Sequence, residues 1–186
     1  MNEFQRLDLF SLPPGLRGRS ALAVQLWWLA QAALFRPSPQ IAYGFRRWLL
    51  RRFGARIGRK VLIRPTATIT YPWKVSIGDY SWIGDDVTLY SLSAIHIGSH
   101  VVVSQRSYLC AADHDMTSPA FPIREGPVRI EDGAWLATDV FVGPAVTVGY
   151  GAVVGARSAV FRALPPATVC HGNPCRPVRP RSRAAS

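Results

Sequence analysis

Apolar side chains recur at every sixth position through most of the chain, and a small residue often follows each of them. A fixed six-residue period is typical of a parallel β-helix, in which short strands wind into coils and every coil buries its apolar position against the next. The pattern therefore predicts that residues 57–165 form such a β-helix. The repeating apolar positions are Ile57, Ile63, Ile69, Ile77, Ile83, Leu89, Ile97, Val103, Leu109, Ile130, Leu136, Val142, Val148, Val154 and Val160.

The six-residue rhythm is interrupted at three places, and these interruptions define the shape of the coil. The step lengthens to eight residues after Ile69 and after Leu89, and to twenty-one residues after Leu109. Every interruption follows a third hexad, so we expect three-sided coils of eighteen residues, about five in all, with extra residues inserted at one corner. The longest insertion forms one long corner loop. The extra residues are assigned to positions 75–76, 95–96 and 115–129.

The N-terminal part of the chain lacks this rhythm and has the composition of helices. Residues 1–19 are rich in Pro and Gly, which predicts an extended N-terminal arm. Residues 20–35 predict an apolar helix that ends before Pro37. About fifteen apolar residues are fewer than the roughly twenty that cross a bilayer. Ser38 is placed as the cap of a second helix, with aromatic residues on one side and arginines elsewhere.

Two roles are open for these helices. They can cap the open end of the β-helix, whose unpaired backbone groups would otherwise invite aggregation, or the Trp and Arg side chains of the second helix can touch a membrane surface. The cap is the favoured role, and the two are compatible. The chain then divides into an arm with a helical cap (1–56), the β-helix (57–165) and a coenzyme-contacting C-terminal tail (166–186).

The net charge of +11 is concentrated at the two ends of the chain. Residues 1–60 carry eleven Arg or Lys against two acids and residues 175–186 carry four Arg and no acid, whereas the region between carries seven against nine. A nucleic-acid binder usually has basic and aromatic residues along one reading face, so we expect no nucleic-acid partner and predict coenzyme phosphates or lipid headgroups at the ends. Three cysteines without metal-ligand spacing indicate a reduced, cytoplasmic setting, with the inner face of the membrane as a variant of it.

Four motifs carry a resemblance to a known family. They are Y-P-W-K-V-S-I-G-D-Y-S-W-I-G-D-D (71–86), V-S-Q-R-S-Y-L-C (103–110), H-D-x-x-S-P-x-F (114–121) and G-N-P-C-R-P-V (172–178). With them the chain resembles the hexapeptide-repeat acyltransferases, and most closely the colanic acid biosynthesis acetyltransferases, over nearly its whole length. The resemblance implies an all-β fold built as a left-handed parallel β-helix.

The resemblance also implies a reaction, the direct transfer of an acetyl group from acetyl-CoA to a sugar hydroxyl in exopolysaccharide or related glycan biosynthesis. His114, at the root of the long loop, matches the family's catalytic histidine, and a neutral imidazole suits a general base. The family's coenzyme pattern falls on Arg176 and Arg179, whose guanidinium groups can hold phosphate oxygens. The small residues that would let the pantetheine arm of the coenzyme pass close to the backbone are Gly155, Ala156 and Ser158.

The acceptor site, for a sugar or a lipid-linked saccharide, is expected to lie between two chains. A single prism offers only half a cleft, whereas a ligand site normally buries most of its ligand, and the resemblance implies a homotrimer. What orients His114 is left open between Asp113, Asp115 and a backbone carbonyl. The residues expected around the acceptor are Asp113, Asp115 and Phe121 from the loop and Asp85, Asp86 and Ser91 from a neighbouring chain.

Other chemistry-bearing residues have less demanding interpretations. His96 is expected at the same corner one coil away, where it lines the cleft or is solvated, while His100, His171 and Cys110 are interpreted as structural. A zinc carbonic anhydrase with this prism would need a second histidine five residues after the first, but position 119 is Pro. We therefore predict no metal site. A non-catalytic scaffold protein is the remaining alternative.

Overall fold

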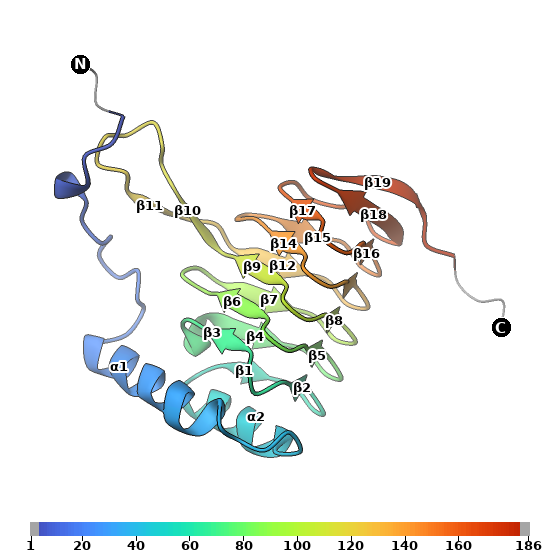
Figure 1. The fold of residues 1–186 in the computed structure, drawn as a ribbon, viewed down its shortest axis with the longest axis horizontal. Coiled ribbons are helices and arrows are strands. Elements are labelled where there is room, and N and C mark those ends of the chain that lie inside the picture. The colour runs from blue at the N-terminus through green and yellow to red at the C-terminus, as the bar shows by residue number, and fades with distance from the viewer. Residues whose placement is uncertain (1–3, 183–186) are drawn as a thin grey trace.

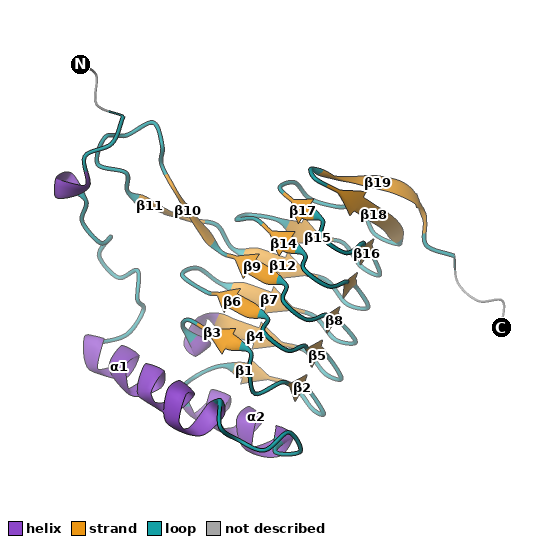
Figure 2. Cartoon of the chain, in the orientation of Figure 1, coloured by secondary structure: helices purple, strands orange, loops and turns teal. Residues whose placement is uncertain are grey.

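Short strands stack into three parallel sheets that form the sides of a prism in the computed structural model, which describes residues 4–182 (Figures 1 and 2). Five complete coils make up the body, and an isolated bridge between Val148 and Leu164 begins a sixth. Face A contains β1 (Arg56–Ile57), β4 (Val75–Ile77), β7 (Ile95–Ile97), β12 (Val128–Ile130) and β15 (Thr147–Val148). Face B contains β2 (Leu62–Ile63), β5 (Trp82–Ile83), β8 (Val102–Val103), β13 (Trp135–Leu136), β16 (Val153–Val154), β18 (Thr168–Gly172) and β19 (Cys175–Pro180). Face C contains β3 (Thr68–Ile69), β6 (Thr88–Tyr90), β9 (Tyr108–Cys110), β14 (Phe141–Val142) and β17 (Ala159–Val160).

The predicted apolar hexad positions all point into the prism and form three vertical stacks. On face B, for example, Ile63 pairs in register with Ile83, which pairs with Val103. Every one of the fifteen positions is at most 8% exposed. Because successive side chains of a strand point to opposite sides, the neighbouring residues of each short strand face outwards. The prism predicted from the six-residue period is confirmed.

The extra residues of the first two coils do not lie where we predicted them. Residues 75–76 and 95–96 belong to β4 and β7, where Ser76 pairs with His96 in register. The additional length lies in the preceding corner, which in the first coil includes a 3-10 turn, Pro72–Lys74. Val75 and Ile95 are apolar and buried, so burial extends the strand backwards into the residues that the count had assigned to a corner.

The long insertion also has different bounds from those predicted. It leaves face C as β10 (Ala112–His114), turns, and returns as β11 (Ile123–Glu125), an antiparallel hairpin that we call the arm. The backbone N–H of Gly126 donates to Ala111 O at 3.0 Å and closes the root of the arm. In Figure 1 the arm extends from the prism beside the N-terminal segment, which carries a 3-10 turn at Leu7–Leu9. The excursion is therefore a two-stranded ribbon rather than the loop 115–129.

Two helices lie at the N-terminal end of the prism (Figure 2). They are α1 (Ala21–Ala30), continued by a π-helical turn η2 (Gln31–Phe35), and α2 (Tyr43–Arg52). Ser20 caps α1, because its Oγ accepts a hydrogen bond from the Ala23 N–H. The expected cap of the second helix is wrong: Ser38 Oγ donates to Phe35 O and thus closes the first helix. Between residues 4 and 182, no helix has the length and apolar character of a membrane span.

The arginines of α2 close the open edges of faces A and B. Arg51 donates from Nε and Nη2 to Ile57 O at 2.9 and 2.6 Å. Arg46 is fully buried and donates from Nε to Ile63 O at 2.6 Å, while its Nη atoms bind the carbonyls of residues 39–40. The basic charge of this end was expected to meet anions. Three of its arginines, Arg46, Arg47 and Arg51, instead satisfy backbone carbonyls of the first coil.

Face C is closed by α1 in the same way. Trp27 Nε1 donates to Ile69 O at 2.8 Å, and Gln31 Oε1 accepts from the Ile69 N–H at 2.8 Å. Trp27 is fully buried, and its ring lies 5.1 Å from that of Phe53. Each of the three sheets thus ends on a side chain of the helices, which confirms the predicted helical cap.

The C-terminal segment forms a hairpin of two strands. After Leu164 the chain enters β18, which pairs in parallel with β16, and returns as β19, which pairs antiparallel with β18. The hairpin 168–180 therefore extends face B. Residues 183–186 lie outside the described part of the chain.

Replacing Arg46 tests the closure of the open end. Arg46→Met keeps the length of the side chain but leaves Ile63 O and the loop carbonyls without donors, so the free energy of unfolding should fall by about 2 to 4 kcal/mol. Thermal unfolding followed by circular dichroism measures the change. Arg52→Met, on the exposed side of the same helix, is the matched control and should stay within about 0.5 kcal/mol of the parent. Equal effects of the two variants would contradict the assigned role of Arg46.

Candidate active site

His114 is the last residue of β10 and is held by a backbone carbonyl. Its Nδ1 lies 2.7 Å from Phe121 O on the returning side of the arm. A carbonyl oxygen can only accept, so Nδ1 carries the proton, and the lone pair of the neutral ring is on Nε2. The ring is thereby fixed in the tautomer in which Nε2 can accept a proton from a substrate.

Aromatic rings flank this imidazole. Phe121 stacks on His114 with ring centroids 4.3 Å apart and an interplanar angle of 8°. The ring centroid of Phe10, from the N-terminal segment, lies 6.1 Å from that of His114, and the two rings are tilted by 51°. The segment is tied to the arm by the Arg6 N–H, which donates to Pro119 O at 2.7 Å. Phe10 was not predicted as a site residue, since it is one of several apolar side chains in residues 1–19 and belongs to no motif.

The two acids beside His114 have partners of their own. Asp113 pairs with Arg124 across the arm, at 3.2 Å from Nε and 3.1 Å from Nη2. Asp115 Oδ1 accepts from Thr117 Oγ1 at 2.6 Å and from the Thr117 N–H at 3.0 Å, and these bonds hold the pKa of Asp115 below its usual value. Of the three candidates for orienting His114, the structure selects the backbone carbonyl.

The other predicted acceptor residues are not brought to His114 within one chain. Asp85 and Asp86 lie at the corner between faces B and C on the second coil, whereas the arm leaves the corner between faces C and A on the third. Asp85 is bound to Arg64 at 2.9 Å, and Asp86 is exposed. Ser91 is fully buried, and its hydroxyl both accepts from and donates to the backbone of Tyr71. Ser91 thus shapes the corner and does not reach a substrate.

The predicted coenzyme residues lie together at the C-terminal end but differ in exposure. Arg176 and Arg179 are exposed on β19, and Ala156 is exposed at the corner between faces B and C. Ser158 is 1% exposed and binds Gly155 O at 2.7 Å, so its hydroxyl is unavailable. A Cβ on Gly155 would lie 2.8 Å from the Cβ of His171, so the glycine is required by the packing of β18.

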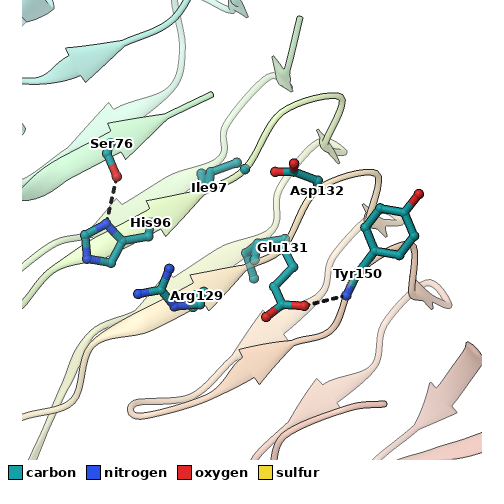
Figure 3. A pocket seen from close by; sticks show the side chains of 9 residues that line it. Ser76, His96, Ile97, Arg129, Glu131, Asp132 and Tyr150 are labelled. Carbon is teal, nitrogen blue, oxygen red and sulfur yellow. Dashed lines mark hydrogen bonds between the residues drawn. The ribbon is translucent and has the colours of Figure 1, made fainter. Parts of the chain in front are cut away.

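His96 lies on a face of the prism, not at the corner where we expected it. Its Nδ1 is 2.7 Å from Ser76 Oγ, and it lines a pocket of about 410 Å³ with Arg129, Glu131 and other residues of face A (Figure 3). Burial, and then the charges of Arg129 and Arg56, lower the pKa of His96. None of the predicted acceptor residues lines this pocket.

Two residues interpreted as structural have structural contacts. His100 stacks on Tyr80 with centroids 5.2 Å apart, and both adopt positive φ at equivalent corners of successive coils. Cys110 Sγ lies 3.1 Å from Ala112 O, and burial raises the pKa of its thiol, which disfavours the nucleophilic thiolate.

The described residues also offer little to a metal or a disulfide. Cys110, Cys170 and Cys175 are all free thiols. Burial raises the pKa of Cys170 to about 11. No group of three His, Cys, Asp or Glu residues between positions 4 and 182 is arranged to hold a metal ion.

The chain is a three-sided coiled prism with a histidine on a projecting arm, and comparison with known proteins shows which class of protein has this architecture. The chain is 56% identical to WcaF of Escherichia coli K12, an acetyltransferase proposed for colanic acid biosynthesis, over 95% of this chain and 97% of WcaF. The chain therefore belongs to the hexapeptide-repeat acetyltransferases. Within that family it groups with the colanic acid biosynthesis acetyltransferases. No family model matches the chain.

Solved structures agree with this family. A maltose O-acetyltransferase from Clostridium difficile 630 superposes with a TM-score of 0.80 at 25% identity, covering 88% of this chain and 90% of that one. A hexapeptide-repeat acetyltransferase from Vibrio cholerae, in complex with acetyl coenzyme A, has the same TM-score and identity, covering 89% and 92%. The predicted left-handed parallel β-helix is confirmed, and the family excludes the scaffold alternative.

Proposed function

We propose that this acetyltransferase moves the acetyl group of acetyl-CoA to a sugar hydroxyl, with His114 as the general base. The observation that carries the proposal is the bond from Nδ1 to Phe121 O, which presents the lone pair of Nε2. Nε2 takes the proton of the acceptor hydroxyl as its oxygen attacks the thioester carbonyl. The tetrahedral intermediate then expels the coenzyme thiolate, which recovers the proton from the imidazolium.

The site around His114 suits a saccharide. Phe121 and Phe10 provide flat apolar walls on which a sugar ring can lie, while the exposed Asp113 and the half-buried Asp115 offer hydrogen-bond acceptors to hydroxyls. WcaF is named for colanic acid biosynthesis, and the Clostridium difficile relative is a maltose O-acetyltransferase. We infer that the acceptor is a sugar or a lipid-linked saccharide of a related glycan.

The coenzyme is proposed to lie near the β18–β19 hairpin. Arg176 and Arg179 are exposed there and can hold phosphate oxygens bidentately, and Ala156 leaves room beside the backbone for the pantetheine arm. The bound acetyl coenzyme A of the Vibrio cholerae relative supports acetyl-CoA as the donor. Gly155 and Ser158 contribute by holding the backbone of this corner rather than by contact.

The outward surfaces of the prism support assembly into a trimer. On face A the outward residues in register are polar, as with Ser76, His96 and Arg129. Face B instead presents apolar residues, including Trp82 and Trp135, which are 54% and 44% exposed. Face C also presents aromatic residues: Tyr108, stacked 6.1 Å from Phe141, and Phe161 beyond it. Faces B and C thus expose apolar surface that a neighbouring chain can bury, whereas the outward surface of face A is polar.

Closed threefold packing covers both apolar faces at once. Face B of one chain can lie against face C of the next, while face A stays in solvent. The arm leaves the edge of face C and reaches over the neighbouring chain. We propose that His114 of one chain and Asp86 of the next form each site, and that activity belongs to this homotrimer.

The general-base role is tested by His114→Ala. Turnover should fall by roughly 10²- to 10⁴-fold, because positioned proton transfer contributes about that much, while the circular dichroism spectrum stays unchanged. Release of free thiol from acetyl-CoA, assayed with a panel of sugars, measures turnover. His100→Asn is the control, since Asn tolerates the positive φ of this position, and it should keep parental activity. A fully active His114→Ala chain would remove the assignment.

The coenzyme contact is tested by Arg176→Ala combined with Arg179→Ala. The KM for acetyl-CoA should rise more than the KM for the acceptor, and the difference should shrink with added salt, as screened phosphate contacts do. Arg17→Ala, an exposed arginine near the opposite end of the prism, is the control. A double variant with parental coenzyme affinity would show that these arginines are merely solvated.

A complementation experiment tests the shared site. His114→Ala and Asp86→Gly, which respects the positive φ at position 86, should each be inactive. Random mixed trimers of the two, made by co-expression, should regain about a quarter of the parental activity, because one interface in four joins an intact His114 to an intact Asp86. No recovery in mixed trimers, or a fully active monomer in light scattering, would contradict the model.

A further inference from the structure

The outer side of α1 and η2 is apolar. Their buried residues Val24, Trp27 and Phe35 face the prism, yet the opposite side exposes further large hydrophobic side chains. Residues 20–35 contain no charged residue at all. A helix that is hydrophobic all round normally has protein or lipid on both sides. The exposed large side chains of this segment are Leu22, Leu26, Trp28, Leu29 and Leu34, of which Leu22 and Leu29 are 68% and 64% exposed.

The outer side of α2 continues this surface. Ile41, just before the helix, is 85% exposed, Phe45 is 38% exposed and Trp48 is 56% exposed. The rings of Phe45 and Trp48 stack with centroids 6.0 Å apart. Arg52 follows on the same helical side and is also exposed. The buried side of the helix holds Arg46, Leu49 and Leu50.

Both outer sides point away from the prism. The inner side of α1 donates to the edge of face C, and the inner side of α2 donates to the edges of faces A and B. Helices whose inner sides cover one end of a prism have their outer sides directed along its axis, away from the coils. Figure 1 shows α1 and α2 together beyond the first coil. We call this outer surface the cap face, defined by Leu22, Leu26, Leu29, Ile41, Phe45 and Trp48.

An exposed surface of this composition is unusual for a protein without a partner. Single exposed hydrophobic side chains are ordinary, but a contiguous patch of several large ones marks an interaction site. The cap helices are also free of acids, because no Asp or Glu occurs between Asp8 and Asp79, a stretch that carries twelve Arg or Lys. Arg19, Arg36 and Arg52 in this stretch are exposed.

We propose that the cap face docks on the surface of a membrane that contains anionic lipids. Tryptophan and phenylalanine side chains suit the boundary between acyl chains and headgroups, and arginines beside them attract anionic headgroups. Cap faces of two chains would bring arginines against arginines with no acid to pair them, so a second copy is the poorer occupant. Docking of this kind is peripheral, since only the outer sides of the helices enter the interface.

The proposed trimer would strengthen the docking. Prisms related by a threefold axis that runs along their length have their cap faces on the same side. Three weak contacts to one surface then act together, because once one cap face is bound the other two are held close to the lipid. One chain alone would bind weakly and reversibly, as single amphipathic anchors do.

This arrangement places the active site near the membrane, a consequence that rests on the proposed function. The arm leaves the third coil, two coil spacings of roughly 4.8 Å from the first, so its root lies on the order of 10 Å beyond the first coil along the prism. The cap helices, each about 10 Å across, add to the distance between this root and the lipid. A saccharide of several sugars, linked through a phosphate group to a membrane lipid, can extend over such a distance. The geometry points to a lipid-linked saccharide rather than a free sugar as the acceptor class.

Vesicle flotation of the purified full chain tests the docking. Vesicles of phosphatidylethanolamine with phosphatidylglycerol should carry the protein at low salt, and vesicles of phosphatidylcholine alone should carry much less. Leu29→Glu combined with Trp48→Glu should lower the bound fraction at least about tenfold, and Arg52→Glu should weaken binding to the anionic vesicles only. Tyr150→Glu, at a corner near the opposite end of the prism and also exposed, is the matched control and should float like the parent.

Three results would overturn the docking proposal. The parent chain fails to float with anionic vesicles at low salt, the control loses flotation as much as the cap-face variant, or the cap-face variant floats normally but forms smaller oligomers in light scattering. The last result would make the cap face an interface between copies of the chain. Thiol release from acetyl-CoA is measured on the same preparations with both lipid-linked and soluble saccharides. Its absence from the parent would count against the proposed function, while flotation would still decide the docking.

Discussion

A parallel β-helix is stable only if its two ends are closed, because the first and last coils have backbone groups without a partner strand. In this chain the first coil receives its donors from side chains. Arg46, Arg51 and Trp27 bind the carbonyls at the edges of the three sheets. The far end is closed on one side by the β18–β19 hairpin. The two helices, the arginines that they direct at the first coil and the folded C-terminal segment all follow from this one requirement.

Much of the fold could be predicted from the sequence, because a six-residue period admits few structures. Ile63, Ile83 and Val103 stack as the count predicts, since each coil repeats the same burial. Counting in sixes failed where an apolar residue could belong either to a corner or to a strand. Val75 and Ile95 were counted as corner residues, yet burial draws them into strands. Nor does a sequence show which arginines will meet carbonyls, because a backbone acceptor has no side chain to signal it.

The candidate site was predictable only in part, for the same reason. His114 could be found from the break in the rhythm and from its motif. Its partner, the carbonyl of Phe121, leaves no trace in a sequence. Phe10 lies more than a hundred positions from His114 and meets it only because the N-terminal segment crosses to the arm. Ser91 and Ser158 were predicted as site residues from the sequence, yet their hydroxyls hydrogen-bond to backbone groups at their corners.

The root of the arm separates its two strands from the prism. Ala111 and Gly126 are joined by a hydrogen bond, and Gly126 lies so close to Pro144 that a Cβ there would be 2.4 Å from the Cβ of Pro144. The chain must therefore leave and re-enter the coil at fixed points, whatever lies between them. Segments of different length and sequence can be exchanged there without shifting the register of the coils. If the arm forms the acceptor site as proposed, changes confined to residues 112–125 can alter the acceptor while the rest of the prism stays the same.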